Sequence, residues 1–254
     1  MRAIDVIIDE ELNISDTTSI NDEQSSVILS ASASSSEASR AECAGNKIRY
    51  LLANARLLAN KFDSLVDKFR ELDLHLAMVN ETWLKNDRET EEAIKDIKDN
   101  EGLEIIKKNR STRGGGVAII YDGKQMKLKR HSIPGNRFEL VCGIGRTTEM
   151  TKKIVVFSLY IPPKQKADTT KRMMECIANC IETLKCDLND PYFIIGGDFN
   201  RRRISAIEDF ADIKQSSTEP TRLNSCLDYV CDNMSAQYSL SEPCLLYTSD
   251  AADE

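Results

Sequence analysis

The chain has 254 residues, of which 34 are Lys or Arg and 41 are Asp or Glu, so its formal net charge is −7. A chain of this length can bury one sizeable α/β core without disulfides or a structural metal. It lacks both an apolar run near the roughly 18 residues that a membrane helix needs and the pattern of a signal peptide. We therefore expect an intracellular protein, nuclear or cytoplasmic and not secreted, with reduced cysteines and no membrane partner.

Residues 1–46 differ in character from the rest. They include a run of serine and alanine at 30–39 and lack a periodic apolar pattern, and the first 45 residues carry the whole net charge of −7. Such a segment cannot bury enough apolar surface to offset its ordering entropy. We therefore expect residues 1–46 to form a disordered, Ser-rich acidic leader.

From Lys47 onward the pattern is that of an α/β domain, which we place at residues 47–243. Short runs of β-type apolar residues predict strands, and apolar residues at helical spacing predict helices. In chain order we expect a strand at 48–54, a helix at 61–72 with Asn60 as its N-cap, a strand at 74–79, a helix at 88–100, strands at 116–121, 138–144 and 154–160, a helix at 169–184, and strands at 192–195 and 227–231. This order favours a mixed sheet, or two packed sheets, with helices outside.

Polar residues follow three of the predicted strands: Asn54, Glu81, and Asp198 with Asn200. A carboxylate at the end of a buried strand is partly desolvated, and two such groups brought together would repel unless a cation lay between them. Hard oxygen ligands without a nearby His or Cys favour Mg²⁺ or Mn²⁺ over zinc.

Each of these features also has an ordinary structural interpretation. The run Gly196-Gly197-Asp198-Phe199-Asn200 could form a turn, because Gly, Asp and Asn are common turn residues. If the backbone there is extended instead, Asp198 and Asn200 share one face. Glu81 or Asn54, taken alone, could be a solvated residue at the edge of a strand.

Six motifs in one order carry a resemblance to a known family. They are Asn54-Ala55-Arg56 with Asn60-Lys61, Asn80-Glu81-Thr82-Trp83-Leu84, Arg113-Gly114-Gly115-Gly116-Val117-Ala118-Ile119, Leu159-Tyr160-Ile161-Pro162-Pro163, Gly196-Gly197-Asp198-Phe199-Asn200 and Leu227-Asp228-Tyr229-Val230. The set resembles the endonuclease/exonuclease/phosphatase superfamily and, more narrowly, the apurinic-type endonuclease domain of non-LTR retrotransposon reverse-transcriptase polyproteins. The resemblance covers about residues 47–240. It implies a four-layer α/β sandwich, in which two packed mixed β-sheets are flanked by helices.

The resemblance implies a metal-dependent phosphodiester hydrolase that nicks target DNA to prime reverse transcription. Its cofactor would be Mg²⁺ or Mn²⁺, its partner DNA, and a reverse transcriptase domain would follow in the full polyprotein. Glu81 would be the principal metal ligand. Asn54 would help to arrange both the metal site and the scissile phosphate.

The resemblance gives four further residues a role in the reaction. Tyr160 would contact the phosphate, Asp198 would orient or deprotonate the attacking water, and Asn200 would hold a phosphate oxygen. Asp228 would orient the catalytic histidine. Arg201, in a basic triplet beside this set, could contact a phosphate backbone or simply lie in a solvated loop.

The chain departs from the family pattern at its end. That pattern closes with Ser-Asp-His, whereas the only two histidines here, His75 and His131, fit neither its place nor its context. Ser249-Asp250 belongs to residues 244–254, which resemble a translated sequencing adapter. We therefore expect a domain truncated before its last strand and its catalytic histidine.

Two alternative functions follow. The same fold and metal could serve a phosphatase acting on a phosphoinositide or another small phosphoester, or the chain could be an inactive, truncated or decayed element that only binds DNA. Charge permits a DNA partner, because residues 46–243 hold 32 basic and 29 acidic residues and so carry +3. The triplet Gly114-Gly115-Gly116 is expected to be a turn into a strand and not a phosphate-binding loop, because no Gly-Lys-Ser/Thr follows it.

Overall fold

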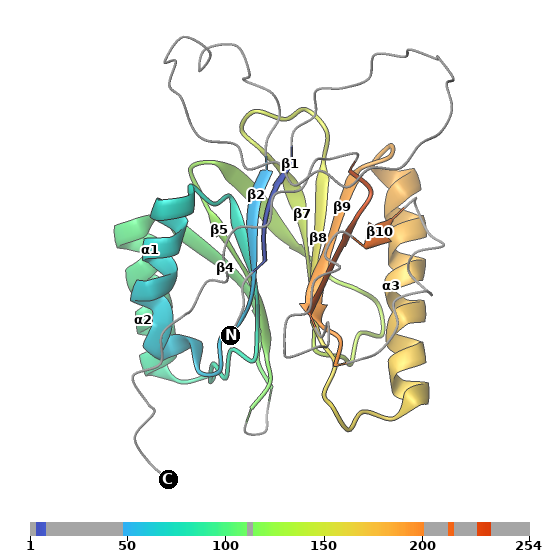
Figure 1. The fold of residues 1–254 in the computed structure, drawn as a ribbon, viewed down its shortest axis with the longest axis horizontal. Helices are drawn as coiled ribbons and strands as arrows, with labels where there is room; N and C mark the ends of the chain where they lie inside the picture. Colours follow the sequence, from blue (N-terminus) through green and yellow to red (C-terminus); the bar gives the residue numbers. More distant parts are fainter. Residues whose placement is uncertain (1–3, 9–47, 111–113, 201–212, 216–227, 235–254) are drawn as a thin grey trace, which may run out of the picture.

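The computed structural model describes residues 4–8, 48–110, 114–200, 213–215 and 228–234. Within these ranges the strands form two sheets, which face each other, with helices on the two outer sides (Figure 1). This is a four-layer α/β sandwich, and it confirms the predicted fold class.

The first sheet has the strand order β1-β2-β3-β5-β4. Its members are β1 (Ile4–Ile8), β2 (Ile48–Asn54), β3 (Leu76–Asn80), β5 (Val117–Asp122) and β4 (Leu103–Lys108). Strands β2 and β3 are parallel, whereas β1, β5 and β4 are each antiparallel to their neighbours.

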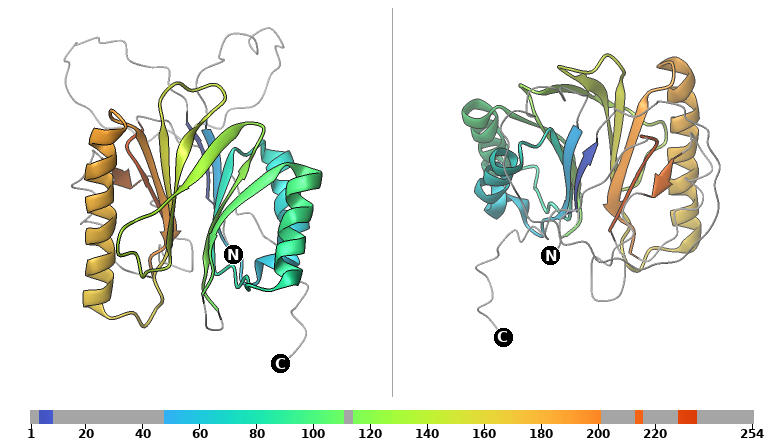
Figure 2. Two further views of the ribbon diagram at one scale, coloured as in Figure 1. Left: turned by 180° about the vertical axis from the view of Figure 1, so that it is seen from behind. Right: turned by 45° about the horizontal axis from the view of Figure 1, so that its top comes forward.

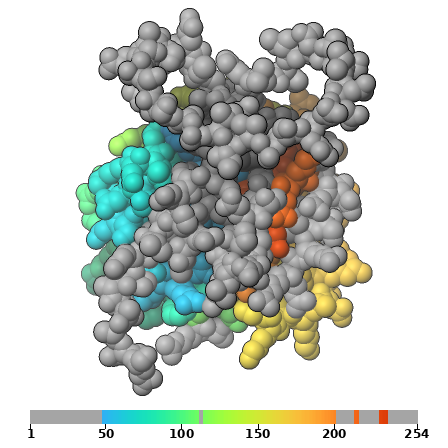
Figure 3. Space-filling model, in the orientation of Figure 1, coloured from blue at the N-terminus to red at the C-terminus, as the bar shows by residue number. Residues whose placement is uncertain are grey.

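The second sheet has the strand order β10-β11-β9-β8-β7-β6. Its members are β10 (Lys214–Gln215), β11 (Asp228–Asp232), β9 (Tyr192–Asp198), β8 (Ile154–Tyr160), β7 (Leu140–Thr147) and β6 (Met126–His131). Only β8 and β9 run parallel in this sheet. Figure 3 shows the orange edge of this sheet at the molecular surface.

Helices α1 (Phe62–Leu72) and α2 (Arg88–Glu101) cover the outer face of the first sheet, and α3 (Ala167–Asp187) covers that of the second (Figure 2). A 3₁₀ turn, η2 (Leu58–Lys61), precedes α1. None of the helices in the described part of the chain combines the length and the apolar character that crossing a membrane requires.

Alternation along each strand divides the core into three layers, because successive side chains of a strand point to opposite faces. In β2, for example, Ile48, Tyr50 and Leu52 lie in the cluster between the sheets, whereas Leu51 and Ala53 lie under α1 and α2. The third cluster lies between the second sheet and α3. All three clusters consist of buried side chains, so the two sheets and their helices form one continuous packed body.

The register of the strands sets the position of the candidate site. The two parallel pairs end at the same edge of the sandwich, with Asn54 beside Asn80 in one sheet and Tyr160 beside Asp198 in the other. Antiparallel β11 places the backbone of Asp228 beside Asp198. Polar residues from distant parts of the chain therefore converge at one end of the molecule.

Three expectations about the elements need correction. Ile4–Ile8 forms strand β1 on β2, so the predicted leader is not wholly without structure; residues 9–46 lie outside the described part. Strands β4 and β6 were not predicted, because Lys and Glu residues interrupt their apolar positions. Asn60 is not an N-cap, because it lies inside η2 and the N-cap of α1 is Lys61.

Candidate active site

The rows of side chains that face the space between the sheets end in polar residues. In β2 the row Ile48, Tyr50 and Leu52 continues to Asn54, and in β3 the row Leu76 and Met78 continues to Asn80. In the second sheet, the row in β8 ends at Tyr160 and the row in β9 ends at Asp198. The alternation that builds the core thus also aims these four side chains at one another.

Asn54 links two carboxylates that come from different sheets. Its Nδ2 lies 3.1 Å from Glu81 Oε1 and 3.4 Å from Asp198 Oδ2. Its Oδ1 is buried and has no hydrogen-bond partner among the described residues. The structure therefore brings Asn54, Glu81 and Asp198 together.

Asn80, to which the sequence analysis assigned no role, joins the sheets beneath this cluster. It is fully buried. With its amide oriented to suit its neighbours, Nδ2 donates to Leu159 O at 2.9 Å and Oδ1 accepts from Asp198 N at 2.8 Å. A buried amide that satisfies two backbone groups of the opposite sheet fixes the distance between the sheets at this end.

The glycines before Asp198 lie within β9 and do not form the turn considered above. A Cβ on Gly196 would meet Met78 Cε at 2.5 Å, in the opposite sheet, and one on Gly197 would meet Leu159 O at 2.1 Å, in the neighbouring strand. Glycine is required at position 197, where the clash is with backbone, whereas at position 196 the flexible end of Met78 would have to move. The strand can therefore carry Asp198 into the narrow space between the sheets.

Tyr160 faces the carboxylates and remains a hydrogen-bond donor. Burial, the negative charges of Glu81 and Asp198, and the hydrogen bond to Glu81 all raise the pKa of the Tyr160 hydroxyl well above its ordinary value. The hydroxyl is therefore protonated at neutral pH. It can donate to Glu81 or to an anionic group placed in the site.

Asn200 lies beside the cluster, but not on the same strand face as Asp198. Strand β9 ends at Asp198, and Asn200 has a φ of 45°, so the backbone has turned. Its backbone N–H donates to Asp198 Oδ1 at 3.0 Å, and its side-chain Nδ2 donates to Ile161 O at 2.8 Å. Of the two alternatives left open by the sequence, the extended one ends at Asp198, because these two hydrogen bonds hold Asn200 in a tight turn.

The structure does not describe the side chains of two predicted site residues, Arg201 and Asp228. Arg201 lies outside the described residues, as do Ser249 and Asp250. The backbone of Asp228 pairs with Asp198 through β11, which places it at the correct edge of the sheet, but its side chain is outside the description.

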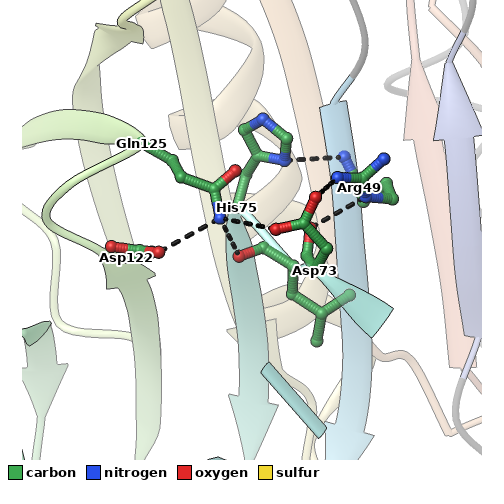
Figure 4. Close-up of polar contacts among 6 residues, drawn as sticks. Arg49, Asp73, His75, Asp122 and Gln125 are labelled. Carbon is green, nitrogen blue, oxygen red and sulfur yellow. Dashed lines mark hydrogen bonds and ion pairs between the residues drawn. The ribbon is translucent and has the colours of Figure 1, made fainter. Parts of the chain in front are cut away.

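Neither histidine takes part in the site. His75 precedes β3, at the end of the strand opposite Asn80, and its Nδ1 accepts from Arg49 N at 3.2 Å (Figure 4). It is 6% exposed, and its burial and the nearby Arg49 charge lower its pKa. His131 ends the edge strand β6. The interpretation of His75 as a satisfied, structural histidine is confirmed.

The donor set of the site fits a hard divalent cation. A carboxylate from Glu81, the unpaired amide oxygen of Asn54 and the nearby Asp198 carboxylate offer oxygen ligands only, which suits Mg²⁺ or Mn²⁺. Among the described residues, no three His, Cys, Asp or Glu side chains converge as a metal-binding group.

Solved structures show which known fold this is. The endonuclease domain of TRAS1, a telomere-specific non-LTR retrotransposon, matches with a TM-score of 0.52 and 16% identity, over 72% of this chain and 83% of that one. The human Nocturnin catalytic domain matches with a TM-score of 0.55 and 11% identity, over 73% and 82%. The mannosyl-6-phosphatase Bt3783 of Bacteroides thetaiotaomicron matches with a TM-score of 0.53 and 14% identity, over 74% and 86%.

A protein described as an endonuclease/exonuclease/phosphatase family member, also from Bacteroides thetaiotaomicron, matches with a TM-score of 0.51 and 13% identity, over 73% and 83%. The chain has the endonuclease/exonuclease/phosphatase fold. No protein-family model and no curated protein matches its sequence. These identities, all below 20%, establish the fold, and the function must be argued from the site.

Proposed function

We propose that the chain is a metal-dependent phosphodiester hydrolase that nicks DNA, as the endonuclease of a non-LTR retrotransposon. The observation that carries this proposal is the bridge made by Asn54 between the carboxylates of Glu81 and Asp198, with the buried Asn54 oxygen left unpaired. An oxygen-only cluster of this kind, at the joined ends of two sheets, suits a cation that also contacts a phosphate.

Glu81 and Asn54 would hold Mg²⁺ or Mn²⁺ through their oxygen atoms. The bound cation would supply positive charge that offsets the negative charge growing on the phosphate. Because Asn54 already donates its amide N–H to both carboxylates, the Oδ1 atom remains as the group available to the metal.

The remaining residues would position and activate the reactants. Asp198 would accept the proton of the attacking water, and Asn80 fixes the Asp198 backbone so that this carboxylate keeps its orientation. Tyr160 would donate its hydroxyl proton to a phosphate oxygen, since its raised pKa keeps that proton in place. Attack in line with the leaving group would give a 3′-hydroxyl and a 5′-phosphate, the ends that reverse transcription needs.

Asn200 and Asp228 have narrower roles in this proposal. The Asn200 amide is held by Ile161 O and Asp198, so it would reach a phosphate oxygen only with its second N–H. Asp228 would support the site from the next strand, beside Asp198. The fold similarity to the TRAS1 endonuclease domain favours DNA as the substrate, and the charge of +3 on residues 46–243 permits it.

A phosphatase acting on a small phosphoester is the second candidate. The observation that favours it is the equally good fold match to a mannosyl-6-phosphatase. An inactive DNA-binding element is the third, favoured by the positions of His75 and His131 away from the carboxylates.

One experiment separates the three candidates. The full chain is incubated with Mg²⁺ and either supercoiled plasmid or inositol phosphates, beside its Asp198→Asn variant and a control, Asp190→Asn, in which an exposed ion pair with Lys152 is lost. We expect nicked plasmid whose new ends a DNA polymerase can extend, with wild-type activity in the control and about 10²-fold or greater loss in Asp198→Asn. Release of phosphate alone would indicate a phosphatase, and plasmid bound without nicking would indicate the inactive element.

A further inference from the structure

The glycine triplet that precedes β5 lies directly beside residues 82–83, which follow the proposed metal ligand Glu81. Gly114, Gly115 and Gly116 have φ values of 82°, 73° and 87°, which glycine adopts at little cost. The carbonyl oxygen of Gly116 accepts from Thr82 N at 3.3 Å, and that of Gly115 accepts from Trp83 N at 2.9 Å. The triplet therefore holds the backbone that immediately follows Glu81.

Glu81 depends on this support because its own backbone conformation is unfavourable. Its φ is 48° and that of Trp83 is 49°, both in the left-handed region that residues with a Cβ seldom occupy. Such a conformation persists only when neighbouring contacts over-determine it. The hydrogen bonds from the glycine triplet are such contacts.

Glu139, the residue before β7, holds the triplet in place through its side-chain carboxylate. Its Oε2 accepts from Gly116 N at 2.6 Å, and its Oε1 forms an ion pair with Arg110 Nη1 at 3.3 Å. The side chain is only 16% exposed. A Cβ on Gly115 would lie 2.4 Å from Glu139 Oε2, so glycine at that position makes room for the carboxylate.

Glu139 also lies within electrostatic reach of the site. Its backbone oxygen accepts from Tyr160 N at 2.9 Å. Its negative charge contributes to the raised pKa of Tyr160, and the charge of Glu81 adds to the burial that raises the pKa of Glu139 itself. Glu139, Glu81 and Tyr160 are therefore neighbours, although they come from three separate strand ends.

We propose that Glu139 is a positioning residue that holds the glycine triplet against residues 82–83 and thereby places the Glu81 carboxylate for metal binding. This role rests on the proposed function, since the metal is part of that proposal. The path from Glu139 to Glu81 consists of a few hydrogen bonds. The Glu139 carboxylate accepts from Gly116 N, and the carbonyl oxygens of Gly115 and Gly116 accept from Trp83 N and Thr82 N. Residues 82–83 directly follow Glu81.

Trp83 provides a direct probe of this path, because it is the only tryptophan of the chain. Its emission and its quenching by acrylamide can be measured in the full chain without metal or substrate. Glu139→Ala and Gly115→Ala should each increase the quenching of Trp83. Glu139→Gln should restore much of the wild-type behaviour, because its amide oxygen can still accept from Gly116 N.

Two matched controls separate positioning from general loss of stability. Gly135→Ala imposes the same backbone strain, at a φ of 68°, but its Cβ would meet nothing within 4 Å. Glu101→Ala removes a carboxylate that is 27% exposed and pairs with Arg70 far from the triplet. Both controls should leave Trp83 quenching at its wild-type value, and urea unfolding of all variants shows how far stability has changed.

Calorimetric titration with Mg²⁺ then tests whether these hydrogen bonds affect metal binding. We expect Glu139→Ala and Gly115→Ala to raise the Mg²⁺ dissociation constant by about tenfold, with smaller changes in Glu139→Gln and the controls. Unchanged Trp83 quenching in both Glu139→Ala and Gly115→Ala would overturn the inference. A wild-type chain that binds no Mg²⁺, with Trp83 quenching altered as expected, would uphold the positioning by Glu139 and overturn the metal-dependent function instead.

Discussion

Asn80 in one sheet holds Asp198 in the other, because the Asn80 Oδ1 accepts a hydrogen bond from Asp198 N at 2.8 Å. The same side chain donates to Leu159 O, so one buried amide satisfies two backbone groups of the opposite sheet. Asn80 thus fixes the backbone of the candidate catalytic residue Asp198, although Asn80 itself need not contact the substrate.

Replacing Asn80 should therefore affect both stability and activity. Asn80→Ala removes the two hydrogen bonds that join the sheets here and leaves a cavity in their place, which should lower the free energy of unfolding by about 2–4 kcal/mol. Urea unfolding measures this change. Asn100→Ala, which removes an exposed amide that donates to Asp96, is the control and should stay within about 0.5 kcal/mol of the wild type. An equal effect of the two substitutions would show that Asn80 does not join the sheets.

Removing the Tyr160 hydroxyl should lower the rate of the reaction more than the affinity for the substrate. Tyr160→Phe keeps the ring but removes a donor aimed at the site, so kcat should fall by about 10²-fold. Tyr121→Phe is a matched control, because Tyr121 lies in the same core between the sheets and donates to Leu128 O instead. Steady-state kinetics that show equal losses in both variants would remove Tyr160 from the mechanism.

The pH dependence of the rate gives a second test of Tyr160. Burial and the charges of Glu81 and Asp198 raise its pKa, so the protonated donor persists to higher pH than for an exposed tyrosine. The wild-type rate should accordingly show no loss from tyrosine ionisation up to about pH 10. A fall with an apparent pKa near that of free tyrosine, absent in Tyr160→Phe, would contradict this account.

His75 should make the stability of the chain depend on pH. Burial, and then the charge of Arg49, lower its pKa from the ordinary value of 6.5, while Glu149 and Asp122 oppose the shift. The unfolded chain therefore binds the proton more readily, so stability is present above the unfolded pKa and is lost as the pH falls below it. His75→Asn, whose Oδ1 can still accept from Arg49 N, should flatten the fall of Tm as the pH is lowered below about 6.5.

The surroundings of His75 explain why this effect should be visible. The Gln125 amide contacts Asp73, Leu74 and Asp122, and Arg49 pairs with Asp73 (Figure 4). These contacts hold the loop before β3, which carries His75, against β2 and the turn that precedes β6. If His75→Asn kept the wild-type slope of Tm against pH, the histidine would not be the group responsible.

Sequence alone predicted the elements whose pattern is unambiguous. The predicted strands at 48–54 and 154–160 match β2 and β8, and the helix at 88–100 matches α2 to within one residue. The two strands were predicted from apolar runs of strand length, and the helix was predicted from a charged segment expected to be exposed. Strand β6 was missed although Met126 and Leu128 alternate with exposed lysines, because only two of its six residues are buried.

The site was only partly predictable for a different physical reason. Asn54, Glu81, Tyr160 and Asp198 stand at strand ends within recognisable motifs, so their convergence could be inferred from the chain. Asn80 and Glu139 act through backbone hydrogen bonds across sheets and loops, which depend on a register that no local pattern encodes. The glycine triplet was the one available signal for Glu139, since three consecutive glycines indicate a backbone approached closely by another group.

The most direct test of the account is the rate at which the full chain nicks supercoiled DNA in Mg²⁺, compared with its Glu81→Gln variant and with EDTA. Glutamine keeps an oxygen that can accept from Asn54 and Tyr160 but removes the negative charge that would bind the cation. We predict nicking that requires Mg²⁺ and falls by about 10²–10³-fold in Glu81→Gln. Nicking that persists in EDTA, or that proceeds at the wild-type rate in Glu81→Gln, would contradict the central claim.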